Sequence, residues 1–509
     1  MGALAAHAQG IKQTAYVKAS NTHGNDHFGN GGTLEGHGLA LSGDGSTMAV
    51  AAPYESSNAK GINGNQNDTS LYASGAVYVF VQRNGQWAQQ AYIKASNSGQ
   101  SYRFGQHIAL SEDGNTLAVS SHFEDSDAKG INGNQNDKSI PQAGAVYVFT
   151  RTGATWTQQA YIKASNTGEK STPDHADEGD QFGFSLALSA DGNTLAAGAI
   201  SEDSKATGVN GDQSDNSQQS SGAVYVYARS GSAWTQQAYV KPSNTWAAML
   251  FGYAVGLSSD GNTLAVSAYD ERGSAREING PQDRNRPGAG AIYVFKRAGT
   301  DWAQTDYLKT HNAENGDSLG YDLAISQDGN TIVGGSGDED CLASGVNPKE
   351  PCDNDYKTDT STGAAYVFVR KDGKWTEQAF IKASHPGKED WFASRLTLSG
   401  DGNTLAVGAQ LENGNSKGLN GNEKDQSAED SGALYLFTRS GDTWVQKAYM
   451  KGSNTEAYDE FGSSMALSKD GKVLAVGARG EGSAAKGVNG DQSDNSAMGA
   501  GAVYVFSNQ

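Results

Sequence analysis

The chain has little of what marks several common classes of protein. Its 509 residues include only two cysteines and nine prolines, and no run of eighteen apolar residues that could cross a membrane as a helix. Positive charge is also scarce, since 38 basic residues stand against 57 acidic ones and give a formal net charge of −19. Because such a charge repels phosphate and anionic lipid headgroups, we expect neither nucleic-acid binding nor membrane insertion. The acidic excess fits either plain solubility or oxygen-rich loops that attract calcium.

The two cysteines, Cys341 and Cys352, lie in one expected loop. A disulfide between them would stabilise the fold by roughly 2 to 3 kcal/mol and would require an oxidising compartment. Two free thiols of a cytosolic protein are the alternative. Because the only cysteines share a loop, the pattern favours the disulfide and a secreted protein, extracellular or at the cell surface.

The first ten residues differ in character from the rest. Residues 1–10 are rich in alanine, like the cleavage region of an export signal, although a cloning leader would have the same composition. We therefore expect 1–10 to be a leader or signal-peptide remnant and 11–509 to be a single domain.

Three sequence markers recur seven times in fixed order. The first is Phe-Gly before a short alternating segment, the second is Asp-Gly-Asn-Thr-Leu-Ala-Val, and the third is Gly-Ala-Val-Tyr-Val-Phe. The first begins at Phe28, Phe104, Phe182, Phe251, Leu319, Phe392 and Phe461, the second at Asp44, Asp113, Asp191, Asp260, Asp328, Asp401 and Asp470, and the third at Gly75, Gly144, Gly222, Gly290, Gly363, Gly432 and Gly501.

A fourth marker, Trp-x-Gln-Gln-Ala-Tyr-Ile-Lys-Ala-Ser, follows the third in six copies. The seventh copy lacks the tryptophan and stands near the N-terminus, at residues 12–20. All four segments alternate apolar and polar residues between turn residues, which is typical of strands, and Asp-Gly is a strong hairpin signal.

Four strands per repeat, repeated seven times at a spacing of about 70 residues, predict an all-β fold. We expect a seven-bladed β-propeller of four-stranded antiparallel blades, closed by the N-terminal strand, which completes the last blade. A two-sheet sandwich would need neither the sevenfold repetition nor the split repeat.

The connections between the expected strands fall into two kinds. The turns between the first and second strands and between the third and fourth are short, whereas the loops between the second and third run to about twenty residues, as in 124–143. In an up-and-down blade the long loops all lie on one face. Because a rigid scaffold commonly carries its binding residues on such loops, we expect the ligand there.

Four long loops repeat a pattern of Asn and Asp at alternate positions, which could wrap a calcium ion with oxygen ligands. The candidate ligands are Asn63, Asn65, Asn67 and Asp68, Asn132, Asn134, Asn136 and Asp137, Asn210, Asp212 and Asp215, and Asn489, Asp491 and Asp494. The alternative is that these side chains only hold tight turns by bonding their own backbone.

Departures from the repeat are candidate ligand-binding residues. Trp246 and Trp391 stand just before the Phe-Gly position, where an exposed tryptophan could stack on a sugar or anchor a protein. Arg272 and Arg276 belong to an arginine-rich loop of the fourth repeat that could receive a carboxylate or sulfate. Packing between loops is the alternative for the tryptophans, and bridging of acidic loops is the alternative for the arginines.

No catalytic signature stands out in the sequence. The nine histidines do not recur in register, and His23, His27 and His37 of the first repeat are the nearest thing to a cluster. We therefore predict no catalytic residue.

The repeat of this chain resembles the FG-GAP repeat of integrin α-subunit propellers and of bacterial integrin-like surface proteins. The resemblance is carried by Phe182-Gly183 with Leu-Ala-Leu-Ser, then Asp-Gly-Asn-Thr-Leu-Ala, then Gly-Ala-Val-Tyr-Val. The resemblance covers nearly the whole chain and implies the propeller fold, but it leaves the function open. The integrin repeat holds calcium between its first two strands in Asp-x-Asp-x-Asp-Gly-x-x-Asp, and here that connection is only Asp-Gly-Asn. Calcium is therefore expected, if anywhere, in the longer loops.

Together these features predict a secreted or cell-surface, non-catalytic adhesion propeller that recognises a glycan or protein ligand through its long-loop face. Two alternatives stay open. One is a polysaccharide-active enzyme of the lyase type, which His, Tyr and Arg converging in a groove would favour. The other is a structural subunit that self-assembles outside the cell.

Overall fold

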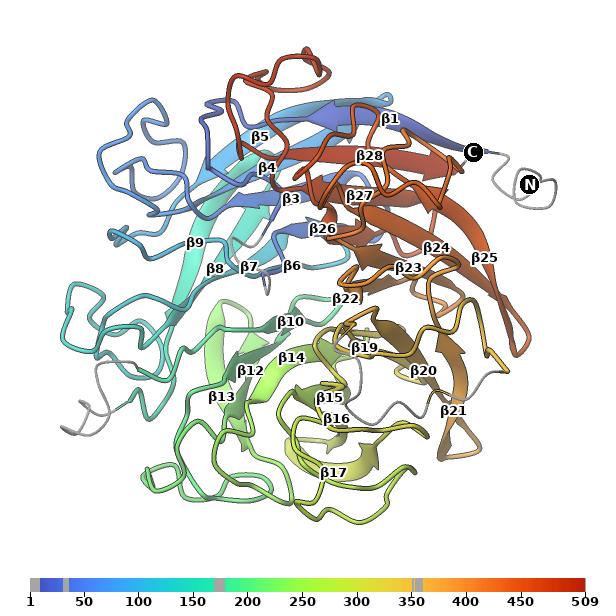
Figure 1. Cartoon of the computed structure of the whole chain (residues 1–509). Coiled ribbons are helices and arrows are strands. Elements are labelled where there is room, and N and C mark those ends of the chain that lie inside the picture. The colour runs from blue at the N-terminus through green and yellow to red at the C-terminus, as the bar shows by residue number, and fades with distance from the viewer. Residues whose placement is uncertain (1–9, 31–35, 169–178, 350–351, 353–359, 509) are drawn as a thin grey trace.

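The computed structural model describes residues 10–30, 36–168, 179–349, 352 and 360–508. Seven four-stranded antiparallel sheets stand around one axis, as Figure 1 shows, and the prediction of a seven-bladed propeller is confirmed. The described residues contain no helix, and so none that could span a membrane. Residues 1–9, most of the predicted leader, lie outside the described residues.

Six blades order their strands from the axis outward as they occur in the chain, and the seventh runs β26, β27, β28 and then β1. The inner strands are β2 (Leu39–Leu41), β6 (Ile108–Leu110), β10 (Leu186–Leu188), β14 (Phe251–Leu257), β18 (Leu323–Ile325), β22 (Phe392–Leu398) and β26 (Phe461–Leu467). The second strands are β3 (Thr47–Ala52), β7 (Thr116–Ser121), β11 (Thr194–Ala199), β15 (Thr263–Ala268), β19 (Thr331–Ser336), β23 (Thr404–Ala409) and β27 (Val473–Ala478).

The third strands are β4 (Ala76–Arg83), β8 (Ala145–Thr152), β12 (Ala223–Ser230), β16 (Ala291–Ala298), β20 (Ala364–Lys371), β24 (Ala433–Ser440) and β28 (Ala502–Asn508). The outer strands are β5 (Gln86–Ile93), β9 (Thr155–Ile162), β13 (Ala233–Val240), β17 (Asp301–Leu308), β21 (Lys374–Ile381), β25 (Thr443–Met450) and β1 (Ile11–Val17).

The ring closes as the split repeat predicts. Strand β1, blue in Figure 1, is the outer strand of the seventh blade and pairs with the red β28 from Ile11↔Asn508 to Val17↔Val503. Ile11 takes the place that Trp87 has in the first blade, where Gln82 pairs with Trp87. Both side chains are buried, so the smaller residue keeps the same packing role.

The repeated markers pack the blades against each other. Phe104 of the Phe-Gly pair lies edge-on to Tyr147 and Phe149 of the third marker, with ring centroids 5.3 and 6.1 Å apart, in the core between the first and second blades. Gly75 has a φ of +81°, and a Cβ there would lie 2.2 Å from the backbone oxygen of Phe104. Glycine opens the third marker because the neighbouring blade's backbone fills that space.

The axis is closed at the end of the short turns. The residues just before the seven Asp-Gly turns form a ring in which each backbone N–H donates to the next carbonyl, over 2.8–3.0 Å. The ring runs through Gly43, Glu112, Ala190, Ser259, Gln327, Gly400 and Lys469. At its centre the Glu112 carboxylate accepts hydrogen bonds from Gln327 Nε2 and from Lys469 Nζ (3.1 Å). A molecule that reaches the axis must therefore come from the other face.

Candidate functional site

The long connections gather on one face, called here the long-loop face. In the first blade β3 ends at Ala52 and β4 begins at Ala76, whereas β4 and β5 are joined across only two residues. The loops that lead from each outer strand to the next blade emerge on the same face. This asymmetry is the one expected from the sequence, and it makes the long-loop face the candidate functional face.

A buried ion pair anchors the long loop in six of the seven blades. In the first blade Glu55, three residues beyond β3, accepts hydrogen bonds from Lys94 Nζ at 2.7 Å and from the Tyr92 hydroxyl at 2.9 Å, and also from Asn21 of the neighbouring loop. Burial lowers the pKa of Lys94, and the adjacent Glu55 carboxylate opposes that shift. The equivalent pairs are Lys18–Glu481, Lys163–Glu124, Lys241–Glu202, Lys309–Glu271 and Lys451–Glu412.

Sequence reasoning missed this anchor, although its signal was present. A glutamate follows every second strand at the same distance, and the lysine belongs to the fourth marker. The two residues are far apart in the chain, so only the pairing of the blade shows that they meet.

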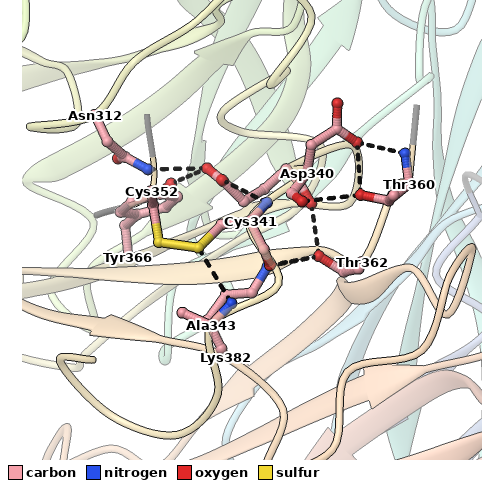
Figure 2. The surroundings of a disulfide bond; sticks show 10 residues. Asn312, Asp340, Cys341, Ala343, Cys352, Thr360, Thr362, Tyr366 and Lys382 are labelled. Atoms are coloured by element: carbon pink, nitrogen blue, oxygen red, sulfur yellow. Dashed lines mark hydrogen bonds between the residues drawn. A yellow bond between two sulfur atoms is a disulfide. The ribbon is translucent and has the colours of Figure 1, made fainter. Parts of the chain in front are cut away.

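The fifth blade anchors its loop differently, and Figure 2 shows the surroundings. Cys341 and Cys352 form the predicted disulfide. Cys341 stands where Ser57 stands in the first blade, and Ser57 Oγ accepts from Ala59 N and donates to the Asn65 carbonyl. Cys341 Sγ likewise accepts from Ala343 N at 3.4 Å. The disulfide thus replaces a hydrogen bond that holds the loop together in other blades.

The predicted calcium ligands lie at the outer ends of the long loops, and most of their side-chain oxygens bond to the loop itself. Asn63 Oδ1 accepts from Tyr92 N at 3.0 Å, Asn65 Oδ1 from Asn67 N at 3.1 Å, and Asp68 Oδ1 from Ser70 N at 3.0 Å. Corresponding bonds to backbone N–H groups involve Asn132, Asn134, Asp137, Asn210, Asp212, Asp215, Asn489, Asp491 and Asp494. In the described part of the chain, no three His, Cys, Asp or Glu side chains group as metal ligands. The calcium site stays a prediction.

The two tryptophans have different surroundings from those expected. Trp246 is only 3% exposed, and the Arg284 guanidinium lies 5.1 Å from its ring centroid, so the expectation of an exposed tryptophan is wrong there. It packs in the core between the third and fourth blades because the arginine-rich loop covers it. Trp391 is half-buried near the axis, with its ring 6.0 Å from that of Tyr321.

The arginines of the fourth blade form ion pairs with neighbouring acids. Arg272 Nη2 lies 3.0 Å from Asp270 Oδ2, and Arg276 Nη2 lies 3.2 Å from Glu314 Oε1. The Arg276 contact matches the alternative in which the arginines bridge acidic loops, whereas Arg272 pairs within its own loop. Their predicted role in binding a ligand stays a prediction.

Aromatic rings surround the axis on the long-loop face. Phe184, Tyr253, Tyr269 and Tyr321 each lie with ring centroids 4.7–5.8 Å from the next, and Trp391 continues the series. They come from the starts of inner strands and the ends of second strands of four successive blades. We call these five residues the aromatic arc.

Histidines of different blades meet beside the arc. The rings of His37 and His107 are 5.6 Å apart, and His37 Nε2 lies 3.1 Å from Asp322 Oδ1 across the axis in the fifth blade. Burial lowers the pKa of His107 well below its usual range. The sequence had suggested a cluster of His23, His27 and His37, but His27 lies against Tyr54 instead. Neighbouring blades, not neighbouring residues, build the cluster.

A cavity of about 290 Å³ lies on the axis beneath this cluster. His37, His107, Asp322, Tyr253 and Tyr321 line it, together with residues of all seven inner strands. Because the ring of backbone hydrogen bonds closes the other end, the cavity belongs to the long-loop face.

The fold and the loops define a seven-bladed β-propeller with one differentiated face. Residues 234–295 and 444–506 match the family model of the FG-GAP repeat. The chain therefore contains FG-GAP repeats at two positions of a seven-bladed propeller, which is consistent with an integrin-α-like propeller. The sequence predicted this recognition, and it is confirmed.

No curated protein matches the chain in sequence. Among solved structures, the WD40 repeats of RRP9 are similar at 10% identity and a TM-score of 0.47, covering 97% of this chain and 99% of theirs. U3-55K is similar at 9% identity and a TM-score of 0.47, covering 98% of this chain and 99% of its own. No function is carried over from these structures.

Proposed function

We propose that the chain is a secreted or cell-surface, non-catalytic adhesion propeller that binds a glycan or protein ligand through its long-loop face. The distribution of exposed apolar side chains carries the proposal. Among the described residues, five large hydrophobic side chains are exposed, and four of them lie on the long-loop face: Tyr72, Leu342, Tyr458 and Met498. Exposed aromatic and methionine side chains are typical of binding surfaces. The disulfide and the FG-GAP repeats support an extracellular setting.

A pair of matched variants tests the face. Tyr72→Ser with Met498→Ser removes two exposed side chains, which are 61% and 79% exposed, from equivalent positions of adjacent blades. Val445→Ser removes a 46% exposed side chain from β25, outside the long loops. Fluorescently labelled protein is applied to a printed glycan array and to intact bacterial and animal cells. We expect the first variant to bind at least about tenfold more weakly and the control to bind normally. Equal binding by all three proteins would contradict the proposal.

Calcium at the Asn/Asp loops is part of the same proposal. An ion that binds only the folded state raises the melting temperature in proportion to its occupancy. Thermal unfolding is measured with excess calcium, with magnesium, and with chelator. A melting temperature that rises with calcium and falls again with chelator would support metal sites in these loops. Identical unfolding curves would show that the Asn and Asp side chains only stabilise the turns of the loops.

A lyase-type enzyme is the second candidate, because His37, His107, Tyr253 and Tyr321 converge on the axial cavity. A lyase that acts on uronates must neutralise the substrate carboxylate, yet the described lining contains Asp322, and Arg395 near it is 1% exposed and donates to the carbonyls of Ser394 and Ser463. We therefore prefer binding to catalysis. Incubation with uronate-containing polysaccharides, followed by ultraviolet absorbance of unsaturated products, separates the two candidates.

Self-assembly into an extracellular structure is a further alternative for the same face. Sedimentation velocity of wild-type protein and of the Tyr72→Ser, Met498→Ser variant distinguishes self-assembly from the binding of a separate ligand. Oligomers that the variant abolishes would make a second copy of the chain the ligand.

A further inference from the structure

We propose that the axial cavity on the long-loop face binds one neutral sugar ring, the terminal unit of a glycan. The inference rests on the proposed function of that face and assigns it a ligand class and a site. It starts from where the seven repeats differ.

Three positions of the repeat vary while their neighbours stay constant. The first two are the two residues before the alternating apolar residues of the inner strand, directly after the Phe-Gly pair or its counterpart in six repeats and after residue 36 in the first. The third follows the second strand, two residues before the invariant anchoring glutamate. The first position holds His37, Gln106, Phe184, Tyr253, Tyr321, Ser394 and Ser463, and the second holds Gly38, His107, Ser185, Ala254, Asp322, Arg395 and Ser464. The third holds Pro53, His122, Ile200, Tyr269, Gly337, Gln410 and Arg479. The fold needs the constant residues, so the variable ones are free to specify a ligand.

The size and walls of the cavity suit a small hydroxylated ligand. Its volume of about 290 Å³ is at the lower end of ligand pockets, which run from roughly 300 to 1,000 Å³. Each inner strand is the edge of its sheet, and residues of all seven inner strands line the cavity. An edge strand presents unpaired backbone N–H and C=O groups, which hydroxyl groups can satisfy.

The aromatic arc provides a platform for the apolar face of a sugar. Tyr253 and Tyr269 are stacked, with centroids 4.7 Å apart and planes at 19°. Such spacings leave no room between rings, so the arc is not a cage that encloses a cation. Tyr253 and Tyr321 line the cavity, and half-buried Tyr269 and Trp391 pack against these two rings. The Tyr253 and Tyr321 rings can cover the C–H groups of a pyranose.

Polar groups beside the platform can bond to hydroxyls. His37 Nε2 and Asp322 Oδ1 lie 3.1 Å apart at the cavity, and Asp322 is 1% exposed. Among the described lining residues, His107 Nε2 is buried without a hydrogen-bond partner. Buried polar atoms of native proteins are normally satisfied, so a ligand or water is expected next to it.

The charges favour a neutral ligand. Asp322 places a carboxylate in the lining, and the Arg395 guanidinium lies 5.8 Å from the ring of the lining residue Tyr321. These opposite charges offset each other, so the cavity selects neither an anion nor a cation. Hydroxyl groups of a neutral sugar suit it, since each can donate to Asp322 and also bond to His107.

The test measures binding of small probes to the whole chain. Methyl glycosides of glucose, galactose, mannose and N-acetylglucosamine are titrated at up to about 10 mM, which saturates a site with a Kd near 1 mM. Methyl glucuronide and choline are the charged probes. Binding is followed by saturation-transfer NMR and calorimetry for wild type, His37→Ala, Trp391→Ala and the control Val445→Ala, whose side chain is 46% exposed on β25, outside the long loops.

We expect at least one neutral glycoside to bind, with His37→Ala and Trp391→Ala each weakening its binding about tenfold or more and Val445→Ala leaving it unchanged. Three results would overturn the inference: no glycoside binds, so that water alone occupies the cavity; only the glucuronide or choline binds; or the axial variants bind normally. If the axial variants still bind cells or the glycan array while no glycoside binds, the sugar site fails and the binding face stands.

Discussion

Single buried side chains hold the long loops in place, and Glu55 is representative. It is 1% exposed and accepts bonds from Lys94, Tyr92 and Asn21, which come from two different loops and a strand. A buried charge with a partner is tolerated, whereas the same charge alone is costly. The loops of a strongly acidic protein thus depend on a few lysines inside it.

Replacing Lys94 by methionine tests this dependence. Removal of one partner of a buried pair costs about 3–5 kcal/mol, so we expect Lys94→Met to lower the apparent Tm by several degrees. The double variant Lys94→Met, Glu55→Gln removes the unpaired charge and should recover much of the loss. Lys205→Met is the matched control, since Lys205 pairs with Asp215 but is 64% exposed. A Tm of Lys94→Met equal to that of the control would contradict the anchoring role.

Buried aspartates of the loops predict a pH dependence. Burial raises the pKa of Asp390 to about 7, and Asp26 and Asp459 behave in the same way. An aspartate in the unfolded chain has a pKa near 3.9, so the folded state binds this proton more tightly. The stabilisation is complete below about pH 4 and is lost as the pH rises through about 7.

We expect Asp390 to lower the apparent Tm as the pH rises from about 4 to about 7, because over this range the folded state holds the proton and the unfolded chain does not. Buried His107 and His122 act in the opposite sense below about pH 6.5, because burial lowers their pKa, so the wild type is compared with the Asp390 variant. Asp390→Asn should flatten the decline, as measured by differential scanning fluorimetry across this window. If the apparent Tm of the variant changes with pH as steeply as that of the wild type, Asp390 does not contribute to the pH dependence.

At the scale of elements, the long loop of the fifth blade carries a covalent anchor in place of a hydrogen-bonded one. Ser57, Ser126, Ser204 and Ser483 occupy the position of Cys341 in four other blades, and each donates to a loop carbonyl. The serines of the other blades therefore show which hydrogen bond a serine at position 341 would form in place of the disulfide.

Two double variants separate the covalent anchor from the hydrogen-bonded one. Cys341→Ala with Cys352→Ala should lose roughly 2 to 3 kcal/mol of stabilisation. Cys341→Ser with Cys352→Ser should lose less, because a hydroxyl then stands where serine stands in the other blades. Apparent Tm and limited proteolysis of the loop, with and without reductant, give the comparison. Reductant should affect the wild type only, and a wild type that does not respond to it would contradict the anchor.

At the scale of the whole molecule, the pairing of β1 with β28 holds the ring together. Their register brings Ile11 opposite Asn508, which is the arrangement at the third-to-fourth strand turns of the other blades. In the first blade that turn is Asn84-Gly85, between the paired residues Arg83 and Gln86. The seventh blade thus lacks only a covalent connection.

A circular permutant tests the closure. Joining Gln509 to Gly10 through Asn-Gly and opening the chain between Gly299 and Thr300, an exposed turn, moves the noncovalent closure to the fourth blade. We expect a monomer with nearly the wild-type Tm, whereas deletion of residues 1–18 should lower the Tm or produce aggregates because β28 becomes an exposed edge. A deletion variant as stable as the permutant would show that β1 does not contribute to the stability of the ring.

The sequence by itself determined the blades, their number, the closing strand and the face of the long loops, because these depend on local alternation, turn residues and repetition. It also determined the disulfide, since Cys341 and Cys352 share one loop. Only the tertiary structure decided that Trp246 is covered by Arg284, that lysines of one strand meet glutamates of another loop, and that His37 lies beside His107 and Asp322. The physical reason is distance along the chain: the axial residues come from different blades, and the closed ring alone brings them to one cavity.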